Sequence, residues 1–377
     1  MKGKCILCGE RFDADPILKL PNMPSCAQNL PDGESVKDDV GVDLNLYSCR
    51  YCGLVQLDCD PVHYYRDVIR AGGGTTTMRE LRDYQYKKFI GMCNLAGKKI
   101  LEVGCGQGEF LEMLSGHPVC GVGIENKQEL VDIAQSKGLN VFRDFAGERS
   151  HVISGGPYDA FMQFNFIEHQ PDPNGMVQCV YNNLVDGGVG LVTAPSWEYV
   201  RNDCTYEIMR DHIAYYDKES LSFLFRKNGF EVLDTEIVIR DTLSLIVKKR
   251  PLVTSNDFKA NFSAISQQMN KFVEEHTVNG CRLAFWAASH QCFTAAALLT
   301  HPEKVNYIVD SAKFKQGRYS PVSHIPIVAP EKLTEEPVNA ILILAPGYTN
   351  EIAKVIRDRF GNAIVLYAMR TESIEKL

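Results

Sequence analysis

The middle of the chain repeats one order of apolar strand, turn and amphipathic helix. The apolar run 100–103 leads into the glycine-rich turn 104–108, and the stretch 109–116 has the apolar spacing of a helix. Further apolar runs end in polar or turn residues at 119–125, 138–145, 158–173 and 184–195. Strands that alternate with helices predict a doubly wound α/β domain with a mainly parallel sheet.

The pattern changes after residue 250. An amphipathic helix and a linker are predicted over 256–280. Strand, turn and helix then recur at 281–299 and 338–356, with a strand that ends at Asp310 between them. We therefore predict a second small α/β unit. The organisation expected from sequence is a front domain at 1–70, a Rossmann-like core at 71–250 and a C-terminal α/β lobe at 251–377.

The turn after the first core strand carries glycines at G-x-G-x-G spacing: Gly104, Gly106 and Gly108. Glycines at such a turn let the backbone approach a ligand closely. Glu102 precedes the turn, and Glu125 ends the next strand, where a carboxylate accepts ribose hydroxyls. This pattern alone also fits a nicotinamide-dependent enzyme, so that alternative remains open.

Polar residues stand where the next two core strands end. Asp144 follows one strand, and Asn165, Glu168 and His169 follow the other. Ligands of open α/β sheets bind at the carboxyl ends of the strands. We take Asp144, Asn165 and His169 as candidates for cofactor binding.

Four of the 13 cysteines stand in two C-x2-C pairs, Cys5 with Cys8 and Cys49 with Cys52, and a glycine follows each pair. Two such pairs are the usual ligands of a tetrahedral zinc ion, and no open coordination position is evident, so we expect a structural zinc site. The segment between the pairs is long and must bulge out. Five other cysteines are expected as small core residues: Cys105, Cys120, Cys179, Cys281 and Cys292.

Composition excludes several classes of protein. The 377 residues carry a net charge of −7, which argues against a general nucleic-acid binder. No apolar run approaches the roughly 20 residues of a membrane span, and the N-terminus lacks the apolar segment of a secretory signal. The odd cysteine count argues against a disulfide framework. We therefore expect a cytoplasmic protein without membrane or nucleic-acid partners, and the oligomeric state stays open.

The core resembles the class I S-adenosylmethionine-dependent methyltransferases. The resemblance rests on the sequence "EVGCGQG" at 102–108, on Glu125 and on the "IEHQPDP" text at 167–173. It implies that S-adenosylmethionine binds along Gly104, Gly106 and Gly108, with Glu125 on the ribose.

The whole chain is similar to the sugar C-methyltransferases, which join a four-cysteine zinc segment, a methyltransferase core and a C-terminal α/β lobe. Those enzymes act on nucleotide-linked 4-keto deoxysugars. The most specific stretch is "YIVDSAKFKQGRYSPVSHIPIVAP" at 307–330, and "PNMPSCAQNL" at 21–30 resembles a segment of the family's zinc domain.

Three departures from that family concern residues that would contact substrate. The family's "Y-H-E-H" loop after the fifth strand falls on 209–212, so Met209 and Arg210 replace a tyrosine and a histidine. Its "D-Y-P-Y" segment falls near 67–70, and its "G-A-x-x-K-G" turn falls on 286–291. These changes indicate a related reaction on a different substrate.

The resemblance implies a base at His212, with Asp211 beside it. Methylation of carbon needs a carbanion or enolate, and a histidine near neutral pKa suits removal of a proton next to a ketone. Arg210, Tyr215 or Tyr216 would stabilise the enolate oxygen. Two rival readings remain open: an O- or N-methyltransferase on the same scaffold, and a zinc- and nucleotide-binding module without catalysis.

Overall fold

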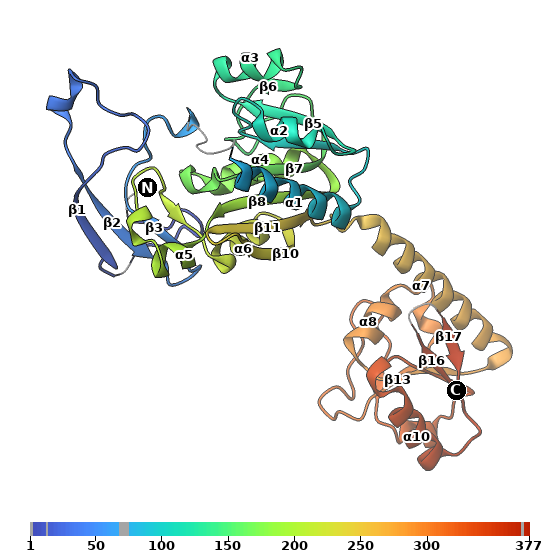
Figure 1. The fold of residues 1–377 in the computed structure, drawn as a ribbon. Coiled ribbons are helices and arrows are strands. Elements are labelled where there is room, and N and C mark those ends of the chain that lie inside the picture. Colours follow the sequence, from blue (N-terminus) through green and yellow to red (C-terminus); the bar gives the residue numbers. More distant parts are fainter. Residues whose placement is uncertain (1–2, 13, 68–74, 371–372) are drawn as a thin grey trace. The chain divides into compact units, whose positions relative to one another are not determined.

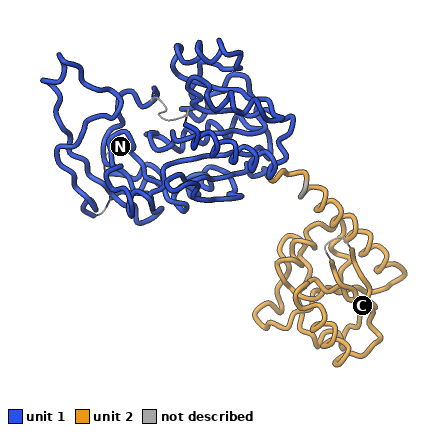
Figure 2. The backbone as a smooth tube through the Cα atoms, in the orientation of Figure 1, with its two compact units in different colours: residues 1–251 blue, residues 252–377 orange. Residues whose placement is uncertain are grey.

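The computed structural model describes residues 3–12, 14–67, 75–370 and 373–377. They form two compact units, 1–251 and 252–377, and each unit is described by itself (Figure 2). The domain boundary expected at 70/71 lies outside the described residues. So do residues 68–70, onto which most of the family's D-Y-P-Y segment falls.

A seven-stranded sheet is the centre of the first unit (Figure 1). The strands β4, β5, β6, β7 and β8 run parallel, whereas β11 is antiparallel to β8 and to β10. The chain reverses its winding between the central strands β4 and β7, which is where open α/β sheets bind ligands. In spatial order, the strands are β10 (Phe230–Val238), β11 (Thr242–Lys249), β8 (Leu184–Pro195), β7 (Tyr158–Phe164), β4 (Lys99–Val103), β5 (Cys120–Glu125) and β6 (Val141–Arg143).

Both faces of this sheet are buried, because alternate residues of each strand enter opposite cores. In β4, Leu101 and Val103 belong to one apolar cluster and Ile100 to another. The helices that complete the unit are α1 (Thr76–Cys93), α2 (Glu109–Leu114), α3 (Gln128–Ser136), α4 (Pro173–Asn183), α5 (Trp197–Asn202) and α6 (Lys218–Lys227).

Side-chain caps fix where several helices begin. The Asp172 carboxylate accepts the N–H of Gly175 at the start of α4, whose first residue is proline. Asp217 and Ser220 form a reciprocal capping box at the start of α6. Four short 3-10 segments link the other elements: η1 (Ser35–Asp38), η2 (Tyr65–Asp67), η3 (Ile167–His169) and η4 (Thr205–Glu207).

A second, antiparallel sheet of four strands lies in the same unit. Three strands come from the front of the chain: β1 (Leu18–Met23), β2 (Val42–Ser48) and β3 (Val55–Leu57). The fourth, β9 (Ala214–Tyr215), comes from the loop after β8 and pairs with β3. Part of the loop expected to carry the chemistry, Ala214–Tyr215, is therefore a strand of the front sheet.

The second unit contains a six-stranded sheet that is parallel except for its last strand. In spatial order, its strands are β14 (Ile327–Val328), β13 (Tyr307–Val309), β12 (Leu283–Trp286), β15 (Ala340–Ile343), β16 (Val365–Met369) and β17 (Ile374–Lys376). Its helices are α7 (Ser255–His276), α8 (His290–Ala297), α9 (Lys332–Glu335) and α10 (Thr349–Phe360), with the 3-10 segments η5 (Val278–Gly280), η6 (Pro302–Lys304) and η7 (Pro346–Tyr348).

The α/β class with Rossmann-like sheets is thus confirmed. Among the helices of the described residues, none combines the length and apolar character that crossing a membrane requires. One expectation about the core was wrong: Cys105, Cys179 and Cys292 are buried, but Cys120 and Cys281 are exposed. Cys120 is the first residue of β5 and Cys281 precedes β12, so each lies where the chain is only entering the sheet.

Candidate active site and four-cysteine cluster

A pocket with about 580 Å³ of empty space lies at the carboxyl ends of β4, β5 and β7. Gly104 and Gly106 line it with φ of 70° and 58°, in the left-handed region that favours glycine. A Cβ at Gly104 would lie 3.8 Å from Phe166. The pocket is lined by Arg66, Val103, Gly104, Gly106, Gln107, Glu109, Ile124, Glu125, Asn126, Leu130, Asp144, Phe145, Ala146 and Phe166.

The Glu125 carboxylate is fixed at the pocket wall by backbone groups. One oxygen accepts the N–H of Gly106 at 3.1 Å, and the other accepts the N–H of Lys127 at 2.9 Å. Each carboxylate oxygen has two lone pairs, so both oxygens of Glu125 can also accept hydrogen bonds from ribose hydroxyls. The glycine floor and the fixed carboxylate of this pocket fit S-adenosylmethionine.

Two residues expected at the cofactor, Glu102 and Gly108, do not line this pocket. Glu102 is fully buried inside β4 and does not line the pocket. Gly108 caps α2 at φ 81°, and a Cβ there would lie 2.3 Å from the Leu139 side chain and 3.3 Å from that of Ala134. Gly108 therefore allows α2 to pack against α3.

Asp144 lines the pocket, but its carboxylate holds the loop that follows β6. It accepts the N–H groups of Phe145 and Ser154 at 2.7 and 2.8 Å and contacts His151 Nε2 at 2.5 Å. Burial opposes ionisation of Asp144, yet these hydrogen bonds together keep its pKa below the usual value. Asn165, at the tip of β7, is exposed with φ of 48°, and its side-chain oxygen accepts the Thr193 hydroxyl.

The segment 209–216 is held against the front of the chain. The two carboxylate oxygens of Asp211 accept the Tyr64 hydroxyl at 2.5 Å and the Ala27 N–H at 2.8 Å. The Arg210 guanidinium donates to the Ser25 carbonyl at 3.4 Å. The carboxylate of Asp211 thus fastens this segment to the stretch 25–27 and is not bonded to the His212 ring. Sequence reasoning missed Tyr64, which no motif marks.

Tyr215 and Tyr216 are both buried, so their hydroxyls do not face an open site. The Tyr215 hydroxyl accepts the Met209 N–H at 2.9 Å and donates to the Met209 carbonyl at 3.2 Å. Tyr216 is fully buried in the cluster that contains Cys5 and Cys52. Burial raises the pKa of both phenols.

His169 and His212 lie together with Glu168. Their rings are in edge-to-face contact with centroids 4.9 Å apart. Phe166 of the pocket wall lies 6.4 Å from the His169 ring, so two successive ring contacts lead from the glycine-lined pocket to His212. The side chain of His212 is partly exposed.

Burial sets the charge of this group. It lowers the pKa of His212 to about 3, with a further contribution from His169, and it lowers the pKa of His169 as well. It raises the pKa of Glu168 to about 8. Both imidazoles are therefore neutral at pH 7. A pKa of about 3 also makes His212 a weaker base than the histidine of near-neutral pKa that the sequence led us to expect. The sequence pointed to His169 and His212, whereas Glu168 was noted only as a polar neighbour.

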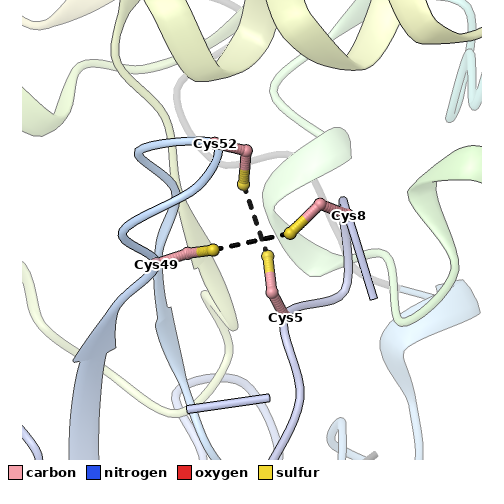
Figure 3. A group of neighbouring side chains, drawn as sticks. All are labelled: Cys5, Cys8, Cys49 and Cys52. Atoms are coloured by element: carbon pink, nitrogen blue, oxygen red, sulfur yellow. Dashed lines mark hydrogen bonds between the residues drawn. The ribbon is translucent and has the colours of Figure 1, made fainter. Parts of the chain in front are cut away.

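The four cysteines of the two C-x2-C pairs converge at one point (Figure 3). Their sulfur atoms lie within 4.8 Å of one another, with Cys5–Cys52 at 3.4 Å and Cys8–Cys49 at 3.5 Å. Sulfurs around a tetrahedral zinc ion are about 3.8 Å apart. The glycines after each pair, Gly9 and Gly53, have positive φ and close tight turns by donating to the carbonyls of Cys5 and Cys49.

The second unit has its own pocket at the carboxyl ends of β12, β13 and β15. It contains about 1120 Å³ of empty space, and its wall includes Ser289, which caps α8. The carboxylate of Asp310 accepts the Ala288 N–H at 2.8 Å and contacts Lys315 Nζ at 3.0 Å. The family's turn at 286–291 forms part of this wall, with His290 and Gln291 facing the pocket.

Comparison with known proteins agrees with this architecture. Residues 78–235 match the family "Methyltransferase domain", and residues 249–366 match the family "C-methyltransferase C-terminal domain". C-methyltransferase NovU of Streptomyces niveus is 24% identical and spans 93% of this chain and 91% of its own.

Two further likenesses cover only part of this chain. A ubiquinone biosynthesis O-methyltransferase of Pseudomonas fluorescens is 30% identical over 25% of this chain, and the match spans 43% of that enzyme. The crystal structure of an S-adenosylmethionine-dependent methyltransferase from Clostridium acetobutylicum overlaps 50% of this chain and 97% of its own, with 16% identity and a TM-score of 0.38.

The glycine-floored pocket and the matched domains define the chain as an S-adenosylmethionine-dependent methyltransferase. The match of the second unit, together with a full-length relative, supports a place among the C-methyltransferases.

Proposed function

We propose that the protein methylates a carbon next to a ketone of a nucleotide-linked sugar, with His212 as the base. The observation that carries this proposal is the position of His212, a neutral histidine two ring contacts from the cofactor pocket. The name of the Streptomyces relative supports methylation at carbon.

We assign a separate role to three groups of residues, each within its own unit. Gly104, Gly106 and Glu125 hold S-adenosylmethionine, which supplies an electrophilic methyl group when bound. In the second unit, the pocket beside Asp310 binds a nucleotide, because its strand ends and helix start suit such a ligand. The four cysteines bind a structural zinc ion that stabilises residues 1–70.

The chemical step leaves the proton on His212. The imidazole removes a proton next to the ketone, and the resulting enolate keeps the electron pair. That pair forms the new carbon–carbon bond as the sulfonium carbon–sulfur bond breaks. Arg210 is the remaining candidate for the enolate oxygen, because the Tyr215 hydroxyl is bonded to Met209 and Tyr216 is buried away from solvent.

An O-methyltransferase is the second candidate, because the core is 30% identical to a ubiquinone biosynthesis O-methyltransferase over 100 residues. A hydroxyl nucleophile needs less help from a base than a carbon does. The effect of His212→Ala therefore separates the two reactions.

The test is NMR of the product formed from S-adenosylmethionine with a 13C methyl group, in D2O, over a panel of nucleotide-linked 4-keto sugars. We expect a new methyl on carbon and deuterium exchange next to the ketone, both lost in His212→Ala. The control is His301→Ala, which removes an exposed histidine of the second unit. If the wild-type protein binds S-adenosylmethionine but gives neither exchange nor carbon methylation, the proposal is contradicted. If the wild-type protein does not bind S-adenosylmethionine at all, a non-catalytic module is favoured.

A further inference from the structure

Glu168, His169 and His212 form a compact group of three potential metal ligands. Glu168 and His169 belong to η3 after β7, and His212 precedes β9. One ligand atom from each side chain lies within 4.8 Å of the others. This group is built from residues different from the four cysteines.

A hydrogen bond fixes the tautomer of His169. Its Nδ1 lies 2.7 Å from the Asp211 carbonyl oxygen, which can only accept, so the proton is on Nδ1. The other nitrogen, Nε2, lies 3.9 Å from Glu168 Oε1. A histidine that donates one ring N–H to a backbone carbonyl and directs the other nitrogen at a carboxylate has the orientation of a metal-bound histidine.

The carboxyl group of Glu168 has an unsatisfied atom. The side chain is 2% exposed, and its Oε2 has no hydrogen-bond partner among the described residues. Burial of a carboxyl oxygen without a partner is unfavourable. A cation between this carboxylate and the two imidazoles removes that cost.

We propose that Glu168, His169 and His212 bind one divalent transition-metal ion, of which Zn²⁺ and Co²⁺ are examples. Two imidazoles and one carboxylate suit such ions and leave a coordination position open. Ligand atoms around a tetrahedral ion are roughly 3.4 Å apart, and His169 Nε2 and Glu168 Oε1, at 3.9 Å, are already close to that spacing. The partly exposed His212 gives the ion a path from solvent.

A bound ion makes the site a switch that turns methylation off. This part of the inference rests on the proposed role of His212 as base, because the nitrogen that binds the ion is the one that accepts the proton. Metal binding itself does not depend on that role.

The experiment titrates the full chain, with its thiol-bound metal in place, with Co²⁺. We expect one further equivalent of Co²⁺ with visible ligand-field bands and no thiolate-to-cobalt charge-transfer band, because no cysteine takes part. Methyl transfer should fall in parallel with occupancy and return with a chelator too weak to strip the four-cysteine site. Glu168→Gln should weaken Co²⁺ binding at least about tenfold, whereas the exposed Glu148→Gln should leave it unchanged.

His169→Asn serves as a second variant if Glu168→Gln does not fold. No further Co²⁺ bound, or binding unchanged in both variants, would overturn the site while leaving the base role of His212 to its own test. Binding at this site that raises the rate would overturn the inhibitory switch and the base role together.

Discussion

Gly108 and Gly106 stand two residues apart in one motif, and their surroundings differ: Gly106 lines the pocket, whereas Gly108 packs against Leu139 and Ala134. Gly108→Ala places a methyl group 2.3 Å from Leu139 at φ 81°. A left-handed alanine costs about 1–2 kcal/mol, and overpacking adds about 1–3 kcal/mol. We therefore expect the first unit to lose roughly 2–5 kcal/mol, a fall in Tm of about 5–15 °C for a unit of this size.

Gly106→Ala is the matched control. Its φ of 58° costs a similar strain, but the new methyl group meets nothing closer than a Glu109 oxygen at 3.5 Å. Without overpacking, we expect a Tm loss of only about 2–6 °C. Because the methyl group enters the pocket, we expect the cofactor affinity to weaken by about tenfold or more, equivalent to about 1.4 kcal/mol.

Calorimetry of the full chain gives the Tm of each variant, and isothermal titration with S-adenosylmethionine gives its Kd. Hydrogen exchange in peptides from α2 and α3 locates the damage. If Gly108→Ala keeps the wild-type Tm while its cofactor affinity falls, the division of tasks between the two glycines is refuted.

Three further predictions concern the front sheet, the cysteines and the loop after β6. Tyr64→Phe removes the hydrogen bond to the Asp211 carboxylate, so the free energy of unfolding of the first unit, measured with denaturant, should fall by about 1.5–3 kcal/mol. We also expect kcat to fall while the Kd for the cofactor stays unchanged. A variant with the kcat of wild type would contradict a positioning role for Tyr64. Cys49→Ser should lower bound zinc, measured by mass spectrometry, and also methyl transfer, because the cysteine cluster shares an apolar core with β4 and α6; full activity without metal would exclude a structural zinc. Asp144 has a lowered pKa in the folded state, so its stabilisation is present above the unfolded pKa of about 3.9 and is lost as pH falls through the folded value. The unfolding free energy of wild type should therefore drop more between pH 5 and pH 3, roughly the range set by these pKa values, than that of Asp144→Asn, and equal drops would refute the assignment.

Local patterns predicted the parallel strands of the core, because each is an apolar run that ends in a turn. They did not predict the antiparallel front sheet or the strands β10 and β11. The pocket glycines Gly104 and Gly106 and the cysteine pairs were equally visible, since their chemistry depends on short spacing. Contacts between distant segments were not visible. The tie from Tyr64 to Asp211 joins residues far apart in sequence, and no spacing rule marks it.

Burial of individual side chains was also beyond the sequence. Glu102, Tyr215 and Tyr216 have residue types suited to a site, yet packing against the sheet encloses them. Glu168 was expected only as a polar neighbour, yet it lies beside two histidines. This position depends on how segment 209–216 folds back on η3, where the Ile213 N–H donates to the Glu168 carbonyl.

The pairing of β9 with β3 limits how this protein can be recombined with relatives. A chimera that exchanges only residues 1–67 would give β9 a foreign neighbour, replace the Tyr64 hydroxyl and place a foreign backbone against the Asp211 carboxylate where Ala27 now donates its N–H. The exchangeable piece is discontinuous: the front segment and the stretch around 209–216 have to be inherited together. Altering substrate choice by grafting therefore requires both pieces from the same parent.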